Sequence, residues 1–163
     1  MEMLAEDKDV LFLGQTTCFP GSPMYASLKD IPGKKKIELP VAEDMQMGMS
    51  IGLSLEGFVP VSIYPRIDFL ILALNQLVNH LDKIEGMSGG EFSPKVIIRT
   101  QIGNTKPLYP GAQHCGDYTK ALKILCKNID VVKIEKAEDL MQEYKKALKS
   151  KRSTILIEIA TGP

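Results

Sequence analysis

The stretch "ELPVAEDMQMGMSIGLSLEGFVPVSIY", residues 38–64, decides the fold because it joins a helix to a strand. Residues from about Val41 to Glu56 are typical of a helix, and Gly57 stands where a glycine commonly ends one. Residues 58–64 are then mostly aliphatic and aromatic, which favours a strand. A helix followed at once by a strand is half of a β–α–β unit, the building block of a parallel sheet.

The same alternation of short aliphatic runs and longer helical segments continues along the whole chain. Strands are expected at 9–15, 35–40, 58–64, 94–102, 130–135 and 153–160, and helices at about 41–56, 68–86, 117–128 and 137–151. This order predicts an α/β fold, a three-layer sandwich with a mostly parallel sheet covered on both faces. Ligands of such sheets bind at the carboxyl ends of the strands, so the long loops 16–34 and 103–116 are candidate functional regions.

Composition and charge exclude several classes of partner. The chain has 163 residues, enough for one domain, and its 20 basic residues balance its 20 acidic ones. No global field therefore draws it to nucleic acid, and no apolar run is long enough to span a membrane. The first ten residues lack the features of a signal peptide, so we expect a cytoplasmic protein without nucleic-acid or membrane partners.

The common catalytic and metal-binding motifs are missing from the sequence. There is no GxGxxG after a strand, no GxxxxGK[ST], no GxSxG and no HExxH. The three cysteines, Cys18, Cys115 and Cys126, form no CxxC pair, which favours incidental or buried thiols over metal ligands. His80 lies within a helix and is expected to be a packing or surface residue, whereas His114 in a glycine- and proline-rich loop is either a solvated loop residue or a site residue.

The helix from Val41 to Glu56 carries two unusual features. Glu43 and Asp44 stand in its first turn, where carboxylates stabilise the positive end of the helix dipole. Gly48 and Gly52 are four residues apart on one face and would let another helix approach closely. The three methionines of the same helix are most simply explained as core residues.

Four segments in this order resemble the pyrimidine-binding domain of thiamine diphosphate enzymes: "PVAEDMQMGMSIGLSLEGFVPV", "DFLILALNQLVNHLDKIEGMSGGEF", "VIIRTQIGN" and "GAQH". The resemblance covers residues 9–160 and is strongest to the β subunit of 2-oxoacid dehydrogenase E1 components, in the superfamily that includes transketolase. It implies the thiamine diphosphate-binding fold of the pyrimidine type and an enzyme subunit that works with thiamine diphosphate and Mg²⁺.

The resemblance also assigns roles to individual residues. In the family, the glutamate matched by Glu43 hydrogen bonds N1′ of the cofactor's aminopyrimidine and so promotes loss of the proton from C2 of the thiazolium. Phe69, with Tyr64 as a second choice, matches the aromatic residue that packs on the pyrimidine. His114 matches a histidine that approaches the reacting end of the cofactor and the substrate. Arg66 either faces an anionic substrate or is a solvated or structural arginine.

The resemblance further implies a partner chain. In this superfamily another domain holds the diphosphate and Mg²⁺ with a GDG motif, which "GDY" at 116–118 does not match. We therefore expect residues 1–163 to be a single pyrimidine-binding domain, without the diphosphate-binding and C-terminal transketolase domains. It would pair with a separate α-type, diphosphate-binding subunit as an α2β2 heterotetramer, with Gly48 and Gly52 allowing a helix of the partner or a symmetry mate to come close.

Three functions fit this interpretation. The first is transketolase-like transfer of a ketol or acyl unit from a small-molecule ketose or 2-oxoacid. The second is the E1 β-type component of a 2-oxoacid dehydrogenase or decarboxylase, and the third is a non-catalytic regulatory or assembly module. The sequence departs from the family at Cys115, where serine is common, at "TQIGN", where "TPIGG" is usual, and at Asn75, where aspartate is frequent. These departures leave the substrate open.

Overall fold

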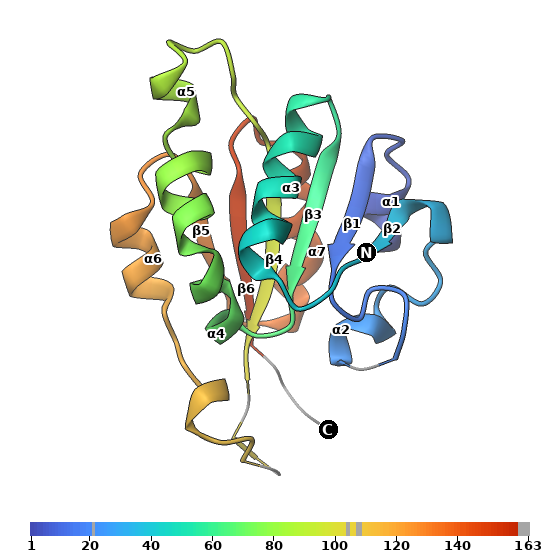
Figure 1. The fold of residues 1–163 in the computed structure, drawn as a ribbon. Coiled ribbons are helices and arrows are strands. Elements are labelled where there is room, and N and C mark those ends of the chain that lie inside the picture. The colour runs from blue at the N-terminus through green and yellow to red at the C-terminus, as the bar shows by residue number, and fades with distance from the viewer. Residues whose placement is uncertain (21, 104, 107–108, 160–163) are drawn as a thin grey trace.

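The computed structural model describes residues 1–20, 22–103, 105–106 and 109–159, and its centre is a six-stranded sheet (Figure 1). The strands are β1 (Val10–Gly14), β2 (Lys36–Glu38), β3 (Val59–Tyr64), β4 (Ile97–Ile102), β5 (Asp130–Ile134) and β6 (Thr154–Ile159). Their order is β2-β1-β3-β4-β6-β5, and every neighbouring pair is parallel. Asn104, Pro107 and Leu108 of the predicted second loop, Gly21 of the first, and Ala160 of the last predicted strand lie outside the described residues.

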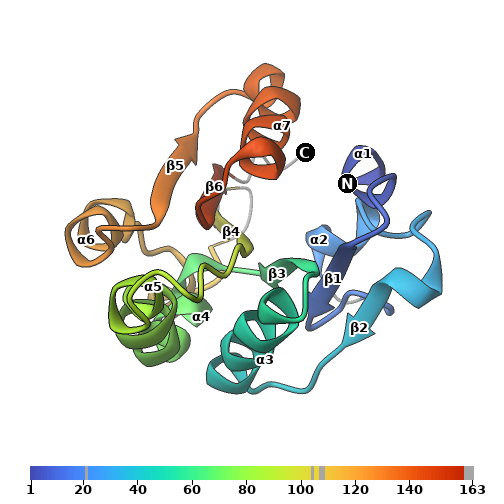
Figure 2. The same ribbon diagram turned by 90° about the horizontal axis from the view of Figure 1, so that it is seen from above.

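Helices cover both faces of the sheet, so the predicted three-layer α/β sandwich is confirmed (Figure 2). One face carries α3 (Glu43–Leu55), a long helix of residues 67–87 and α6 (Thr119–Leu125). The other face carries α1 (Glu2–Ala5), α2 (Pro23–Ala26) and α7 (Leu140–Lys149). Three short 3₁₀ turns complete the described helices: Gly33–Lys35, Ala112–His114 and Ala137–Asp139.

The apolar core is split by the sheet into two clusters. Ile97 of β4 points into the cluster beneath α7, and the next residue, Ile98, points into the cluster beneath α3. Ile155 and Leu156 of β6 are divided in the same way. Because both faces are buried, the strands consist of nearly continuous aliphatic residues rather than alternating apolar and polar ones.

Helix α3 and the long helix beside it end in different ways. Gly57 has a φ of +92° and its N–H donates to Ser54 O, so the prediction that it ends α3 is confirmed. The prediction that Gly86 ends the following helix is wrong. The helix continues to Met87, and the left-handed residues are Gly89 and Gly90.

The long helix (residues 67–87) is also less regular than its sequence predicted. It consists of α4 (Ile67–Leu70), a 3₁₀ turn (Ile71–Ala73), a π-helical segment (Asn75–Leu81) and α5 (Ile84–Met87). π-Helical segments are rare and often lie at functional sites. This irregular helix lies beside α3 and begins at the carboxyl edge of the sheet (Figure 1).

Candidate functional site

Glu43 lies at the carboxyl edge of the sheet, as the first residue of α3 (Figure 1). Only 6% of its surface is exposed, although it is an acidic residue. Its Oε1 accepts a hydrogen bond of 3.3 Å from Nε2 of Gln15, the residue that follows β1. The start of a helix favours a negative charge, which helps the chain to keep this carboxylate buried.

Gln46 fixes the first turn of α3 against the sheet. Its amide Nε2 donates to Ile63 O at 2.9 Å and to Ser62 Oγ at 3.1 Å, at the end of β3. Gly14, the last residue of β1, has a φ of +148°, and a Cβ there would lie 2.4 Å from Ile63 O. The sequence analysis did not identify Gln46, although a polar residue three positions after Glu43 on a buried helix face was a usable signal.

A second group of predicted residues meets where the long helix begins. His114 belongs to the 3₁₀ turn Ala112–His114, and its ring lies edge-on to Phe69, with 5.6 Å between the ring centroids. Arg66 Nη1 donates to the backbone oxygen of His114 at 2.9 Å. The fold thus brings Arg66, Phe69 and His114 together, although Arg66 and His114 are 48 positions apart in the sequence. In this contact the Arg66 guanidinium holds the loop, which is the structural alternative left open by the sequence.

Asp68 is a further member of this group that the sequence analysis missed. Its Oδ1 accepts a hydrogen bond of 3.1 Å from the backbone N–H of Gly116, so Arg66 holds the loop at His114 and Asp68 holds it two residues later. A Cβ on Gly103 would lie 2.6 Å from His114 O, so the chain packs tightly here. The sequence signal that could have identified Asp68 was its place in the first turn of a predicted helix, next to Phe69.

Several buried polar atoms in this region lack a hydrogen-bond partner among the residues that the structure describes. They are Oδ2 of Asp68, Nδ1 of His114 and Oγ1 of Thr100, which lies on β4 beside Tyr64 of β3. Buried polar groups are rarely left unpaired in finished structures. These three unpaired atoms set this region apart from the rest of the described fold.

Tyr64 does not lie where the second-choice prediction put it. Its side chain is completely buried in the core, and burial raises the pKa of its hydroxyl well above the usual value. The hydroxyl donates to Glu43 O at 3.3 Å. The ring has no open face for a ligand, so Tyr64 supports the start of α3 and the predicted ring contact passes to the half-buried Phe69.

Comparison with known proteins identifies relatives of this chain. No family model matches it. The β subunit of the pyruvate dehydrogenase E1 component from Gracilaria tenuistipitata var. liui is 32% identical over 117 residues, and that from Cyanidium caldarium is also 32% identical over 117 residues. Over these 117 residues the chain is similar in sequence to E1 β subunits. The matches cover 69% of this chain, which itself spans only 35% of the length of these relatives.

Solved structures share the fold of this chain at much lower sequence identity. A split gene transketolase, solved as an inactive β4 tetramer, has a TM-score of 0.76 at 17% identity over 99% of this chain and 48% of its own. Transketolase from Campylobacter jejuni has a TM-score of 0.67 at 13% identity, over 94% of this chain and 23% of its own. An enzyme from Mycobacterium smegmatis described as thiamin diphosphate-dependent has a TM-score of 0.63 at 18% identity, over 95% and 30%. The predicted transketolase-like fold is thereby confirmed.

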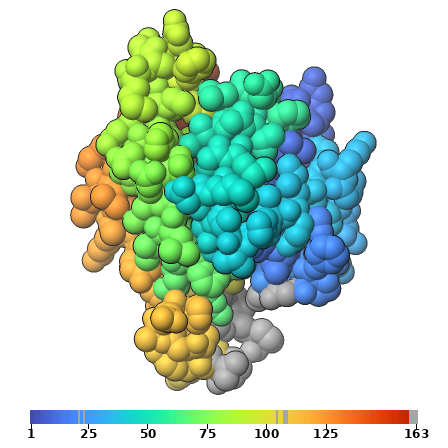
Figure 3. Space-filling view, in the orientation of Figure 1, coloured from blue at the N-terminus to red at the C-terminus, as the bar shows by residue number. Residues whose placement is uncertain are grey.

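The outer face of α3 carries exposed apolar side chains. Of its methionines only Met47 is buried, so the prediction that all three are core residues is wrong for Met45 and Met49, which are 44% and 37% exposed. Ile71 and Leu72, on the segment of the long helix that packs beside α3, are also exposed. Figure 3 shows the face on which both helices lie. We call Met45, Met49, Gly52, Ile71 and Leu72 the α3 face.

The two glycines of α3 have different surroundings. Gly48 faces the long helix of its own chain, and a Cβ there would lie 3.9 Å from Gln76 Cδ. Gly48 is half-buried, and part of the space beside it is taken by this contact within the chain. Gly52 is exposed, and among the described residues no atom lies within 4 Å of the position that its Cβ would take. Of these two glycines, Gly52 is the one with open space above it among the described residues.

The remaining predicted residues lie away from any cluster that could bind a metal. His80 is exposed, with Nδ1 3.3 Å from Asn75 O, as expected for a surface residue. Cys126 is buried, and Cys18 and Cys115 are half-buried free thiols. Within the described ranges no group of histidine, cysteine and acidic residues is placed to hold a metal ion, and no helix is long and apolar enough to cross a bilayer.

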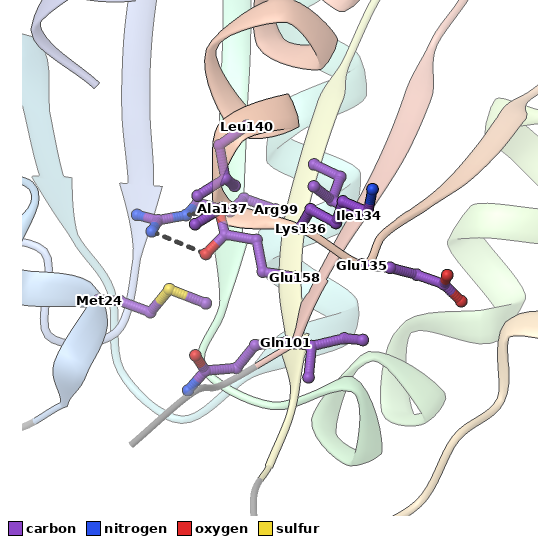
Figure 4. Close-up of a pocket in the computed structure, with 10 residues that line it drawn as sticks. Met24, Arg99, Gln101, Ile134, Glu135, Lys136, Ala137, Leu140 and Glu158 are labelled. Atoms are coloured by element: carbon purple, nitrogen blue, oxygen red, sulfur yellow. Dashed lines mark hydrogen bonds and ion pairs between the residues drawn. The ribbon is translucent and has the colours of Figure 1, made fainter. Parts of the chain in front are cut away.

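A cavity of about 220 Å³ lies on the opposite face of the sheet, near the ends of β4 and β6 (Figure 4). Arg99 and Glu158 point toward one another in it, joined by hydrogen bonds of 2.9 and 3.1 Å. Tyr144 donates to the same carboxylate at 2.6 Å, and Arg99 Nη1 donates to Ser27 Oγ at 2.7 Å. These charges are neutralised by one another, and none of the predicted site residues lines the cavity. We therefore place the candidate site at Glu43, not here.

Proposed function

We propose that this chain is the pyrimidine-binding subunit of a cytoplasmic, thiamine diphosphate-dependent enzyme, completed by a separate α-type subunit that binds the diphosphate and Mg²⁺. The observation that carries the proposal is the position of Glu43. It is a buried carboxylate in the first turn of α3, at the carboxyl edge of a transketolase-like parallel sheet. Sequence similarity to E1 β subunits supports the same interpretation.

The residues at this edge fit the aminopyrimidine half of the cofactor. Glu43 would form a hydrogen bond to the ring nitrogen N1′ of the aminopyrimidine. It would use Oε2, because Oε1 already accepts from Gln15. The half-buried Phe69 ring would pack on the pyrimidine, and the unpaired Nδ1 of His114 would face the reacting end or the substrate. When bound, thiamine diphosphate supplies an acidic carbon whose deprotonated form attacks carbonyl groups.

Two reactions remain in competition for this site. The first is transfer of a ketol or acyl unit from a small-molecule ketose or 2-oxoacid, supported by the transketolase-like fold. The second is the E1 β-type step of a 2-oxoacid dehydrogenase or decarboxylase, supported by the sequence relatives. In either case the positions of Glu43, Phe69 and His114 imply the same handling of the cofactor.

The test is co-expression of the chain with its candidate diphosphate-binding partner, followed by turnover assays with a ketose phosphate and with pyruvate. Glu43→Gln should lower kcat by at least about 100-fold, the usual effect of removing a positioned acid–base group. Asp44→Asn is the matched control, because Asp44 is the adjacent acid but is exposed and accepts only from Gln76 at 3.3 Å. It should keep nearly full activity. Unchanged turnover in Glu43→Gln would refute the catalytic role and favour a non-catalytic assembly module.

We further propose that the α3 face packs against another subunit in an α2β2 assembly. Exposed apolar side chains grouped on adjacent helices are typical of protein interfaces. Gly52 lies among them and has open space above it, so a close-packed helix could sit against it.

Gly52→Leu should therefore impair assembly on size-exclusion chromatography without destabilising the isolated chain. Leucine is a better helix former than glycine by roughly 0.5–1 kcal/mol, so monomer stability should not fall. Gly52→Ala is the control, since it gives a similar helix benefit with much less bulk. Normal assembly of Gly52→Leu would show that the partner does not cover this position.

A further inference from the structure

Glu38, the last residue of β2, accepts hydrogen bonds from the loop that follows β1. Its Oε1 accepts a hydrogen bond of 2.6 Å from the backbone N–H of Thr16. Its Oε2 accepts 2.7 Å from the N–H of Cys18 and 3.0 Å from Oγ1 of Thr17. One carboxylate therefore holds three consecutive residues, a set of contacts that the function described so far does not use.

These contacts hold a loop that would not keep this shape by itself. Thr16 has a φ of +55°, the left-handed region that residues other than glycine rarely adopt. Burial tends to raise the pKa of the Glu38 carboxyl, but the hydrogen bonds from Cys18, Thr16 and Thr17 outweigh it and the pKa lies below its usual value. Glu38 is therefore an anion whose charge stabilises the strained turn.

Gln15 lies between the end of β1 and the three residues that Glu38 holds. On one side Gly14 pairs with Glu38 in one neighbouring strand and Ile63 in the other. On the other side Thr16 is bound to Glu38. With both of its neighbours fixed, Gln15 directs its amide to Oε1 of Glu43, 3.3 Å away.

We propose that Glu38 is a positioning residue, which holds Gln15 against Glu43 and thereby fixes the orientation of the Glu43 carboxylate. The inference rests on the proposed function of Glu43. A carboxylate with one oxygen held by Gln15 presents the other in a defined direction, and such preorganisation matters because small misplacements are costly in catalysis. The hydrogen bonds of the Glu38 side chain among the described residues all go to Thr16, Thr17 and Cys18, so it would act through the loop.

The first measurement is amide hydrogen exchange on the isolated chain. Glu38→Gln should increase exchange at Thr16 and Cys18 by about tenfold, the effect of losing hydrogen bonds to a charged acceptor. Asp82→Asn is a matched control. Asp82 is a buried carboxylate that also holds a loop, accepting from the N–H groups of Lys127 and Asn128 at 2.9 and 2.7 Å near the amino end of β5. It should loosen its own loop and leave Thr16 and Cys18 unchanged.

The second measurement is turnover by the reconstituted enzyme. Gln15→Leu and Glu38→Gln should each lower kcat by about tenfold, and the double variant should be no slower than Gln15→Leu alone, because Glu38 acts through Gln15. Asp82→Asn should keep its kcat, which separates positioning from general loss of stability.

Two outcomes would overturn the proposal: a Glu38→Gln variant with faster exchange but normal kcat, or losses that multiply in the double variant. Glu43→Gln separates this failure from failure of the proposed function. If Glu43→Gln is inactive while Glu38→Gln is normal, only the positioning role is wrong. If Glu43→Gln is itself active, the proposed function is wrong and the positioning role falls with it.

Discussion

Glu43 and Glu158 are two glutamates with little exposed surface, at the same edge of the sheet but on opposite faces. Glu158 accepts hydrogen bonds from Arg99 Nε, Arg99 Nη2 and the hydroxyl of Tyr144. Among the described residues, the side chain of Glu43 accepts one hydrogen bond, from the neutral amide of Gln15. The chain satisfies one buried charge within itself and leaves the other open. A satisfied network contributes to a rigid fold, whereas an open carboxylate can bind a second molecule.

The surroundings of the two glutamates extend this contrast. Near Glu158 the cation, carboxylate and hydroxyl bind one another, and the pKa of Tyr144 is raised well above its usual value, chiefly by burial. On the Glu43 side, buried atoms of Asp68 and His114 have no partner among the described residues. The carboxyl edge of the sheet therefore has one side on which the polar groups bind one another and one side on which some buried polar atoms are unpaired.

The sharpest way to break this comparison is to make the same substitution on both sides. Glu158→Gln should lower the free energy of unfolding by about 3 kcal/mol, because it leaves the buried Arg99 without its counter-charge. Glu43→Gln should change it by less than about 1 kcal/mol, because a single long hydrogen bond is lost. Urea denaturation of the isolated chain measures both values.

Equal losses in the two variants would contradict the division. If Glu43→Gln were as destabilising as Glu158→Gln, the Glu43 carboxylate would be part of the structural network. A stability gain in Glu43→Gln would sharpen the comparison, since functional groups are often held at a cost to stability.

The sequence predicted the fold well because its signals are local. Aliphatic runs separated by helical segments suffice for six parallel strands, and Gly57 ends α3 through its own backbone conformation. The irregular helix from residue 67 to 87 was missed because an apolar stripe does not distinguish α-helical from π-helical hydrogen bonding. The exposure of Met45 and Met49 was missed because it reflects a surface that this chain does not cover.

The site was predicted only in part, for a related reason. Glu43, Phe69 and His114 were predicted through resemblance to a family, not from periodicity, and their roles stay predictions. Gln15 and Glu38 were missed because their roles depend on contacts across 28 and 22 residues of sequence, between side chains or between a side chain and the backbone. Such contacts follow from the order of the strands, which places β2 beside β1, and from the packing of α3 against β1 and β3.

Asp117 extends the comparison to a carboxylate that has several hydrogen-bond partners but is exposed, so the expected effect on stability is smaller. Its Oδ1 accepts from the N–H and hydroxyl of Thr119, and its Oδ2 binds Lys133 at 2.8 Å. These partners, first the hydrogen bond from Lys133, lower the pKa of Asp117 to about 2. A folded-state pKa below the unfolded value stabilises the protein above pH 4, and this stabilisation is lost as the pH falls through about 2.

Asp117→Asn should therefore cost less than about 1 kcal/mol at pH 7, since the ion pair is exposed and solvent weakens it. The difference from wild type should shrink as the pH falls from 4 to 2, in urea denaturation series at fixed ionic strength. A penalty as large as that of Glu158→Gln would mean that the number of partners, rather than burial, sets the value of a satisfied carboxylate. Burial would then not explain why the chain keeps Glu158 paired and Glu43 open.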